Sequence, residues 1–224
     1  GDKLKTADLF PLCSTDIEIV QINVGKRCNM LCKHCHVEAG PARSEAMQEW
    51  VFKRCLEIIK DANIGTVDIT GGAPEMNPNL VWFILDVARL NTRLIVRSNL
   101  VILMEDAYKH FIDLYTDNRV EIVASLPDYR VEKSDKQRGK ESFINTIQMI
   151  RMLNAKGYGI PESGLVLNLV HNPVGAYLSG PQNVGFHPAD GDSHALRRGR
   201  GRGGNPVGGR RRIGRSKSAA INGE

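Results

Sequence analysis

The chain has 224 residues, a formal net charge of +5 and a 42% hydrophobic content, which suits one sizeable globular domain. No apolar run is long enough to span a membrane, and the first residues lack the apolar core of a secretory signal, so we expect a cytoplasmic protein. The charge is uneven, since residues 197–224 carry +8 and the remainder carries −3. The predicted folded part is therefore slightly acidic, and nucleic-acid binding by it is not expected.

Residues 1–16 are predicted to form a lead-in, in which Cys13 is expected to be a small buried hydrophobe. Short β-rich segments then alternate with segments of helical period. The predicted strands span residues 17–24, 66–70, 93–98, 120–126 and 165–170. Four helices are predicted. The first runs from Ser44 to Ala62, and the second has Asn77 as its N-cap and Pro78 as its first residue. The third and fourth cover residues 108–115 and 143–153.

This alternation predicts βαβ units with a parallel sheet and right-handed crossovers. About five units are present over residues 17–182, too few for an eight-stranded barrel, so we expect an α/β fold in the form of a partial (βα) barrel. The glycine-rich and polar segments follow the predicted strands, and parallel sheets bind their ligands at the carboxyl ends of strands. Cys55 falls on the apolar stripe of the first helix and is expected in the core.

Cys28, Cys32 and Cys35 follow the first predicted strand with the spacing C-x3-C-x2-C. Three thiolates in one loop are suited to hold three irons of a four-iron cluster, which leaves the fourth iron open to another ligand. The loop therefore predicts a [4Fe–4S] cluster whose free iron binds S-adenosylmethionine. The alternative is a Cys3His zinc site completed by His34 or His36.

Other candidate ligand-binding residues lie at the ends of later strands. They are the turn Gly71, Gly72, Ala73 and Pro74, and the polar residues Ser98, Asn99, Ser125 and Asn168. Glycines in the turn permit close approach of a ligand to the backbone, as for the amino group of a bound amino acid. Glu75 is expected either to support this turn or to touch the ligand. Arg138 is expected in a polar loop, solvated unless it pairs with a carboxylate.

Residues 183–224 differ in character from the rest of the chain. The segment from Arg197 to Arg215 is almost entirely glycine and arginine, so we expect residues 183–224 to form a disordered tail. A zinc-bound binding protein whose Arg/Gly tail contacts RNA is therefore an alternative to an enzyme, and an inactive fragment is another.

Several separate blocks carry a resemblance to the radical SAM superfamily, and more narrowly to arsenosugar biosynthesis radical SAM proteins. They are QINVGKRCNMLCKHCHVEAGPARSEAM, TVDITGGAPEMNPN, VRSNL, VASLPDY, DKQRGKESF and LNLVHNPVGAYL. The resemblance covers about residue 9 to about residue 182. The chain departs from it near Asn183, which resembles a truncated or frameshifted reading of a longer gene.

The resemblance implies that the three clustered cysteines bind a [4Fe–4S] cluster. It places the Gly71–Pro74 turn at the methionine part of S-adenosylmethionine, with Ala73 where many relatives have glutamate, and Ser98, Asn99, Ser125 and Asn168 near the nucleoside. The implied activity is reductive cleavage to a 5′-deoxyadenosyl radical and transfer of the deoxyadenosyl group to a methylated trivalent arsenic compound. The implied partners are this small-molecule substrate and an electron donor such as flavodoxin or ferredoxin.

Overall fold

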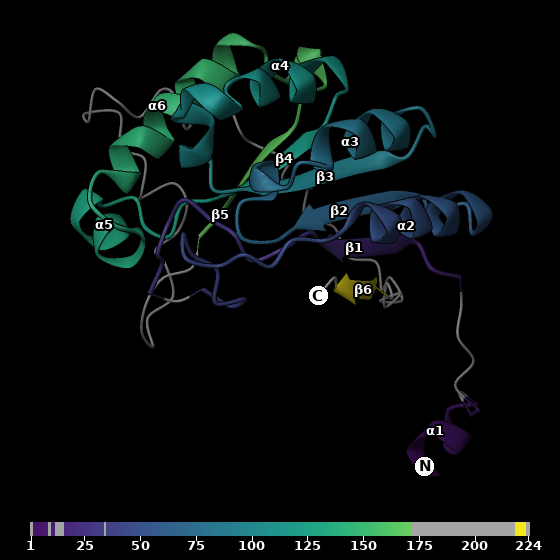
Figure 1. The fold of residues 1–224 in the computed structure, drawn as a ribbon. Coiled ribbons are helices and arrows are strands. Elements are labelled where there is room, and N and C mark those ends of the chain that lie inside the picture. Colours follow the sequence, from purple (N-terminus) through teal and green to yellow (C-terminus); the bar gives the residue numbers. More distant parts are fainter. Residues whose placement is uncertain (1, 9, 12–15, 34, 172–217, 223–224) are drawn as a thin grey trace.

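The computed structural model describes residues 2–8, 10–11, 16–33, 35–171 and 218–222 (Figure 1). Its centre is a parallel sheet with the strand order β5-β4-β3-β2-β1-β6. The strands are β1 (Ile19–Asn23), β2 (Thr66–Thr70), β3 (Arg93–Ser98), β4 (Glu121–Ser125), β5 (Leu167–Val170) and β6 (Ser218–Asn222). The predicted α/β class with parallel strands is confirmed, and β1 to β5 lie side by side in chain order.

The helices are α1 (Asp2–Thr6), α2 (Glu49–Asp61), α3 (Leu80–Ala88), α4 (His110–Asp117), α5 (Val131–Arg138) and α6 (Ser142–Ala155). Short 3-10 turns span Pro74–Met76, Val101–Met104, Asp106–Tyr108 and Pro161–Ser163. Figure 1 shows α2, α3, α4 and α6 on the same face of the sheet. Each lies between consecutive strands of the chain or directly before β5, as parallel βαβ connections require.

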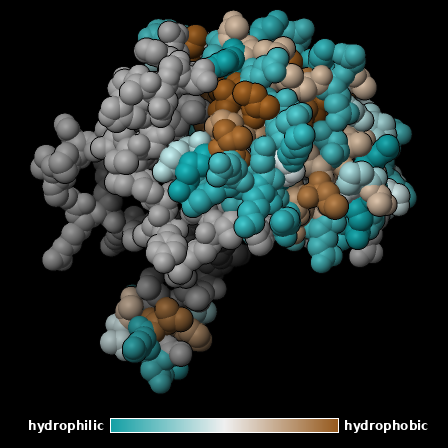
Figure 2. Space-filling view, turned by 90° about the vertical axis from the view of Figure 1, so that its left-hand side faces the viewer, coloured by the Kyte–Doolittle hydropathy of each residue, from teal (hydrophilic) through white to brown (hydrophobic). Residues whose placement is uncertain are grey.

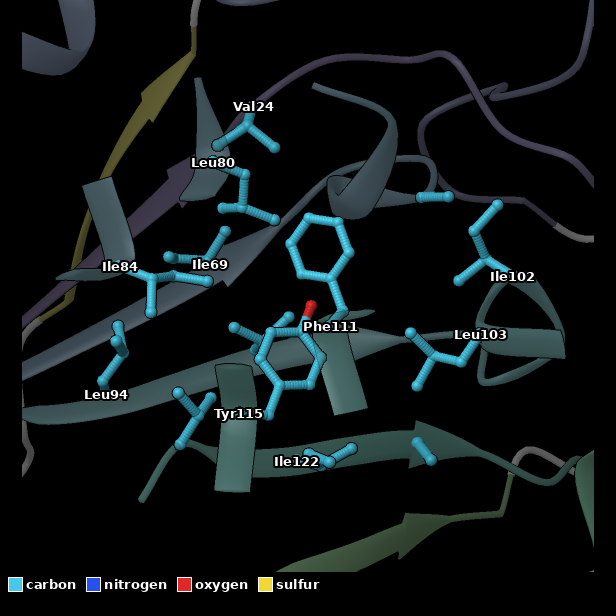
Figure 3. Close-up of a cluster of buried hydrophobic side chains, with 14 of the residues drawn as sticks. Val24, Ile69, Leu80, Ile84, Leu94, Ile102, Leu103, Phe111, Tyr115 and Ile122 are labelled. Carbon is cyan, nitrogen blue, oxygen red and sulfur yellow. The ribbon is translucent and has the colours of Figure 1, made fainter. Parts of the chain in front are cut away.

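The main core lies between the sheet and these helices. Phe111 and Tyr115 of α4 are buried with their ring centroids 5.5 Å apart, and Figure 3 shows them with Leu80 of α3 and Ile122 of β4. Full burial of one such side chain contributes about 1.5–3 kcal/mol. Cys55 of α2 is also buried, as expected from its place on the apolar stripe.

The prediction of a polar loop before Gly139 was wrong, because residues 131–138 form α5. The sequence VEKSDKQR has no apolar stripe, so its periodicity gave no helical signal. Gly139 ends this helix with a φ of +108°, a conformation that favours glycine. Because this helix was not predicted, Arg138 was expected to be solvated unless it paired with a carboxylate, whereas its side chain is buried.

Asn77 does not cap the helix that follows it. The helix begins at Leu80, and the Asn77 side chain instead donates to the carbonyls of Val24 (2.8 Å) and Met47 (3.1 Å). Its Oδ1 accepts the N–H of Asn79 at 2.9 Å. Asn77 therefore ties the turn after β2 to the chain that follows β1. The first helix is also shorter than predicted, since α2 begins at Glu49.

One segment of the tail for which disorder is expected carries a strand in the structure. Residues 218–222 form β6, which pairs in parallel with β1 from Ile19↔Ser218 to Asn23↔Asn222. The remainder of residues 183–224, like Cys13 and His34, lies outside the described residues.

No helix in the described ranges combines the length and apolarity needed to cross a membrane. Figure 2 shows hydrophobic residues in small groups among hydrophilic ones on the face that it displays.

Candidate cluster and cofactor site

A cavity of about 530 Å³ lies beside the carboxyl ends of β2, β3, β4 and β5. The predicted site residues that line it are Cys28, Cys32, Cys35, Gly71, Gly72, Ser98, Asn99 and Ser125. Parallel order explains why segments so distant in sequence meet here, since all these strands end at the same edge. Ala73, Pro74 and Asn168 are not among the lining residues.

The cysteine loop presents free thiols to this cavity. Cys28 is buried, whereas Cys32 and Cys35 are half-buried. The Met30 N–H donates to Cys28 Sγ at 3.4 Å, and the Ala39 N–H donates to Cys35 Sγ at 3.2 Å. Burial raises the pKa of the Cys28 thiol, and the Met30 N–H partly offsets this effect. Donors aimed at sulfur favour the thiolate form, which is the form that binds metals.

The described residues contain no group of three or more His, Cys, Asp or Glu side chains close enough to hold one metal ion. A tetrahedral zinc site needs its sulfur ligands within about 2.3 Å of one ion. An iron–sulfur cluster instead accepts each thiolate on a different iron, so its ligands lie farther apart. Three cysteines that line one cavity therefore suit a cluster, in which each would bind a different iron.

The glycine turn after β2 packs directly against the backbone that leads into the cysteine loop. The Gly72 N–H donates to Gly25 O and the Ala73 N–H donates to Arg27 O, both at 2.9 Å. A Cβ on Gly72 would lie 2.4 Å from Arg27 O, closer than any van der Waals contact allows. The glycine at position 72 is required by this approach, and Arg27 immediately precedes Cys28.

We predict that Gly72→Ala destabilises the protein by about 1–3 kcal/mol, as overpacking usually does, and lowers the iron bound after reconstitution. The new methyl group displaces Arg27 and with it the first cysteine. Gly65→Ala is the matched control, because its Cβ would be 3.7 Å from Glu18 O, an ordinary contact. Urea unfolding and iron analysis measure both effects, and equal iron contents in the two variants would contradict the prediction.

The end of β3 carries a backbone conformation that is rare for side-chain-bearing residues. Leu100 has a φ of +63° and is fully buried. Hydrogen bonds on either side hold the turn, because Ser98 Oγ accepts the Leu100 N–H at 3.2 Å and Asn99 Oδ1 accepts the Ile102 N–H at 2.9 Å. The Asn99 side chain is thereby fixed at the rim of the cavity.

Arg138 joins three of the loops that surround the cavity. Its guanidinium donates to the carbonyls of Ser125 and Asn99, the latter at 3.0 Å, and to Met30 Sδ at 3.6 Å. No carboxylate among the described residues pairs with it. A buried positive charge held only by neutral acceptors favours an anionic ligand in the adjoining cavity.

The sheet face opposite the helices is polar where it approaches the cavity. Arg97, which lines the cavity, pairs with buried Asp68 at 2.7 Å, and Gln21 donates to the same carboxylate at 3.0 Å. Farther along, Asn168 donates to Glu121 at 2.6 Å. The Asn168 side chain therefore binds a carboxylate of the neighbouring strand, β4.

Thr70, Arg97 and Gln137 line the cavity but were not singled out in the sequence analysis, whereas His36, which also lines it, was named there only as an alternative zinc ligand. Arg97 offered a signal, because a charged residue inside an apolar strand must face a polar environment. Gln137 offered none, since its helix was not predicted.

Glu75 supports the core rather than the cavity. It is buried and is absent from the cavity lining; its Oε1 accepts the Tyr115 hydroxyl at 3.0 Å. Its Oε2 has no hydrogen-bond partner in the described part of the chain. Burial raises the pKa of this carboxyl above its usual value, and the Ser98 and Tyr115 hydroxyls only partly oppose the shift.

We predict that Glu75→Gln makes the free energy of unfolding less dependent on pH. A raised pKa means that the folded protein binds this proton more tightly than the unfolded chain. The stabilisation from the proton is complete below the unfolded pKa near 4.5 and declines as the pH rises toward the folded pKa. Glutamine has no such decline. Between pH 5 and pH 8, urea unfolding should therefore show the free energy of unfolding of the variant rising relative to that of the wild type.

The control for this prediction is Glu57→Gln, which removes an exposed carboxylate of α2. It should follow the wild-type pH profile. A Glu75→Gln profile parallel to that of the wild type would contradict a raised pKa of the Glu75 carboxyl.

The family model of the radical SAM superfamily matches residues 22–172, well over half of the chain. The chain belongs to the radical SAM superfamily. Members of this superfamily are enzymes that use a [4Fe–4S] cluster and S-adenosylmethionine. The matched segment contains all three clustered cysteines and the strands β2 to β5 whole.

Two curated relatives are similar to part of this chain. The antilisterial bacteriocin subtilosin biosynthesis protein AlbA of Bacillus subtilis is 26% identical over 134 residues, which are 58% of this chain and 29% of that protein. A probable GTP 3′,8-cyclase of Methanopyrus kandleri is 38% identical over 73 residues, 31% of this chain and 22% of that protein. The chain thus spans less than a third of the length of either relative.

Solved structures show the same fold. Streptococcus suis SuiB bound to S-adenosylmethionine matches with a TM-score of 0.56 and 17% identity, over 75% of this chain and 36% of SuiB. The structure of anSMEcpe with bound AdoMet matches with a TM-score of 0.53 and 14% identity, over 68% of this chain and 43% of that one. The predicted partial barrel of the radical SAM type is therefore confirmed as a fold.

Proposed function

We propose that this chain carries the catalytic core of a radical SAM enzyme, with the cluster on Cys28, Cys32 and Cys35. The observation that supports this most is that these thiols share one cavity with the Gly71–Gly72 turn. Two N–H groups already point at the sulfurs of Cys28 and Cys35, so the loop suits bound thiolates.

The residues around the cavity suit the methionine end of S-adenosylmethionine. The carbonyls of Gly71 and Gly72 accept no hydrogen bond from any described residue and are proposed to bind the ammonium group. Arg138 is proposed to bind the carboxylate, because its charge is buried beside the cavity and no acidic residue in the described part of the chain pairs with it. Ammonium and carboxylate would then be held by groups from different strand ends.

Ser98, Asn99 and Ser125 are proposed to face the nucleoside, with Ser125 exposed at the end of β4. A cofactor-binding role for Ala73, Pro74 and Asn168 is proposed from the family resemblance, since none of the three lines the cavity. The apolar part of the lining, Val37, Ala39, Val123 and Pro127, limits access of water. When bound, the cluster and S-adenosylmethionine supply reductive cleavage to a 5′-deoxyadenosyl radical.

The substrate proposal comes from the resemblance of the sequence blocks to arsenosugar biosynthesis proteins. We propose transfer of the deoxyadenosyl group to a methylated trivalent arsenic compound, with flavodoxin or ferredoxin as electron donor and the cytoplasm as compartment. The alternative is a zinc-bound RNA-binding protein, whose support is limited to the Gly/Arg-rich residues 197–215.

Anaerobic reconstitution with iron and sulfide tests the proposed function. We predict that the wild type turns brown, binds about four irons and cleaves S-adenosylmethionine under a strong reductant, whereas Cys32→Ala does not cleave it. Cys55→Ala is the matched control, because Cys55 is buried in α2 away from the cavity and should leave cleavage intact. A colourless protein with one zinc per chain, or cleavage by Cys32→Ala, would contradict the proposal.

Arg138 gives a second test, on binding. We predict that Arg138→Ala raises the Kd for S-adenosylmethionine about tenfold or more, since a hydrogen bond to a charged group contributes about 1.5–3 kcal/mol. Arg138→Lys should lose less, because it keeps the charge. Arg89→Ala removes an exposed arginine at the C-terminal end of α3 that does not line the cavity, and this variant should bind as the wild type. Equal affinities for Arg138→Ala and Arg89→Ala in calorimetry on cluster-loaded protein would exclude the carboxylate role.

A further inference from the structure

The side chain of Asn99 contacts a proposed cluster ligand from outside the cysteine loop. Its Nδ2 lies 3.6 Å from Cys28 Sγ and 2.9 Å from Asn29 Oδ1. One amide hydrogen is therefore available for each acceptor. Among the described residues, Asn99 is the one side chain of another segment that donates to any of the three clustered sulfurs.

The orientation of this amide is determined by its surroundings. Asn99 Oδ1 accepts the backbone N–H of Ile102, which can only donate, so the NH₂ group must face Cys28. The rare backbone conformation at Leu100 places Ile102 within reach. Asn99 is thus held in position by the turn whether or not a cluster is bound.

The donor is also connected to a carboxylate. Asn29 Oδ1 accepts from Asn99, and Asn29 Nδ2 donates to Glu105 Oε1 at 2.8 Å. A carboxylate is acceptor-only, so Glu105 fixes the Asn29 amide in this direction. The amide oxygen and nitrogen of both Asn29 and Asn99 thus have partners among the described residues, and the Asn99 hydrogen that Asn29 does not use faces Cys28.

Hydrogen bonds to cluster sulfurs are among the features that set the reduction potential of an iron–sulfur centre. Reduction adds one electron and one negative charge to the cluster, and an N–H donor at a ligand sulfur stabilises that charge. We propose that Asn99 is a positioning residue that raises the reduction potential of the cluster through the sulfur of Cys28. This assignment rests on the proposed cluster site. The half-reaction takes one electron from a low-potential donor, and no covalent bond forms or breaks in it.

The test is an EPR-monitored redox titration of the reconstituted full chain. Asn99→Asp replaces the donor by a negative charge of nearly the same shape, so the ratio of reduced to oxidised cluster at a fixed potential should fall about tenfold. This corresponds to a midpoint lower by about 59 mV for a one-electron couple. Asn99→Leu removes the donor without adding charge and should shift the midpoint in the same direction by less.

Asn118→Asp is the matched control, because it makes the same charge change at the end of α4, before β4, at the opposite edge of the sheet. It should leave the midpoint unchanged. Wild-type midpoints in both Asn99 variants, with full cluster occupancy, would overturn the proposal while leaving the cluster site itself intact.

A measurement on the wild type covers the case in which the Asn99 variants lose their cluster. Pulsed EPR of the reduced protein, labelled with ¹⁵N in the asparagine side chains, should detect a nitrogen coupled to the cluster. No such coupling in a fully loaded protein would overturn the role of Asn99 alone. A wild type that binds no cluster would overturn this inference and the proposed function together.

Discussion

The site depends on direct contact between two stretches of backbone. The glycine turn after β2 hydrogen bonds through its amides to the carbonyls of Gly25 and Arg27, and the room for this contact exists because residue 72 has no side chain. The contact fixes where the cysteine loop begins relative to the end of β2. It also uses the amide donors of Gly72 and Ala73, whereas the carbonyls of Gly71 and Gly72 accept no hydrogen bond from any described residue.

Arg138 completes this arrangement from the other side of the cavity. One guanidinium binds the carbonyls at the ends of β3 and β4 and the sulfur of Met30 in the cysteine loop. A buried cation is costly unless it has several acceptors or an anion nearby. The three neutral acceptors explain how the Arg138 charge is accommodated, and no acidic partner lies among the described residues. In the proposed site, the side chain that joins the loops would therefore also bind the anionic group of the cofactor.

Much of this was readable from the sequence, because each helix and strand with an apolar period appeared near its predicted place. The strands over residues 66–70 and 93–98 match in full, and parallel order brought their ends together as expected. The polar helix α5 had no such period, so neither it nor the burial of Arg138 was predicted. Asn168 does not line the cavity, and its amide donates instead to Glu121 on the adjacent strand β4. Such pairings depend on register, which composition does not reveal.

The turn at Leu100 shows how local strain and site chemistry are connected. A buried leucine with a positive φ carries a conformational cost of about 1–3 kcal/mol, and such residues persist only where the surroundings hold them. Here the Ser98 hydroxyl and the Asn99 carboxamide hold the turn, and the same carboxamide reaches Cys28 with its remaining donor. An aspartate would still accept from Ile102 but offer no donor to sulfur. The contact with Cys28 is therefore the part of this turn that backbone geometry alone does not require.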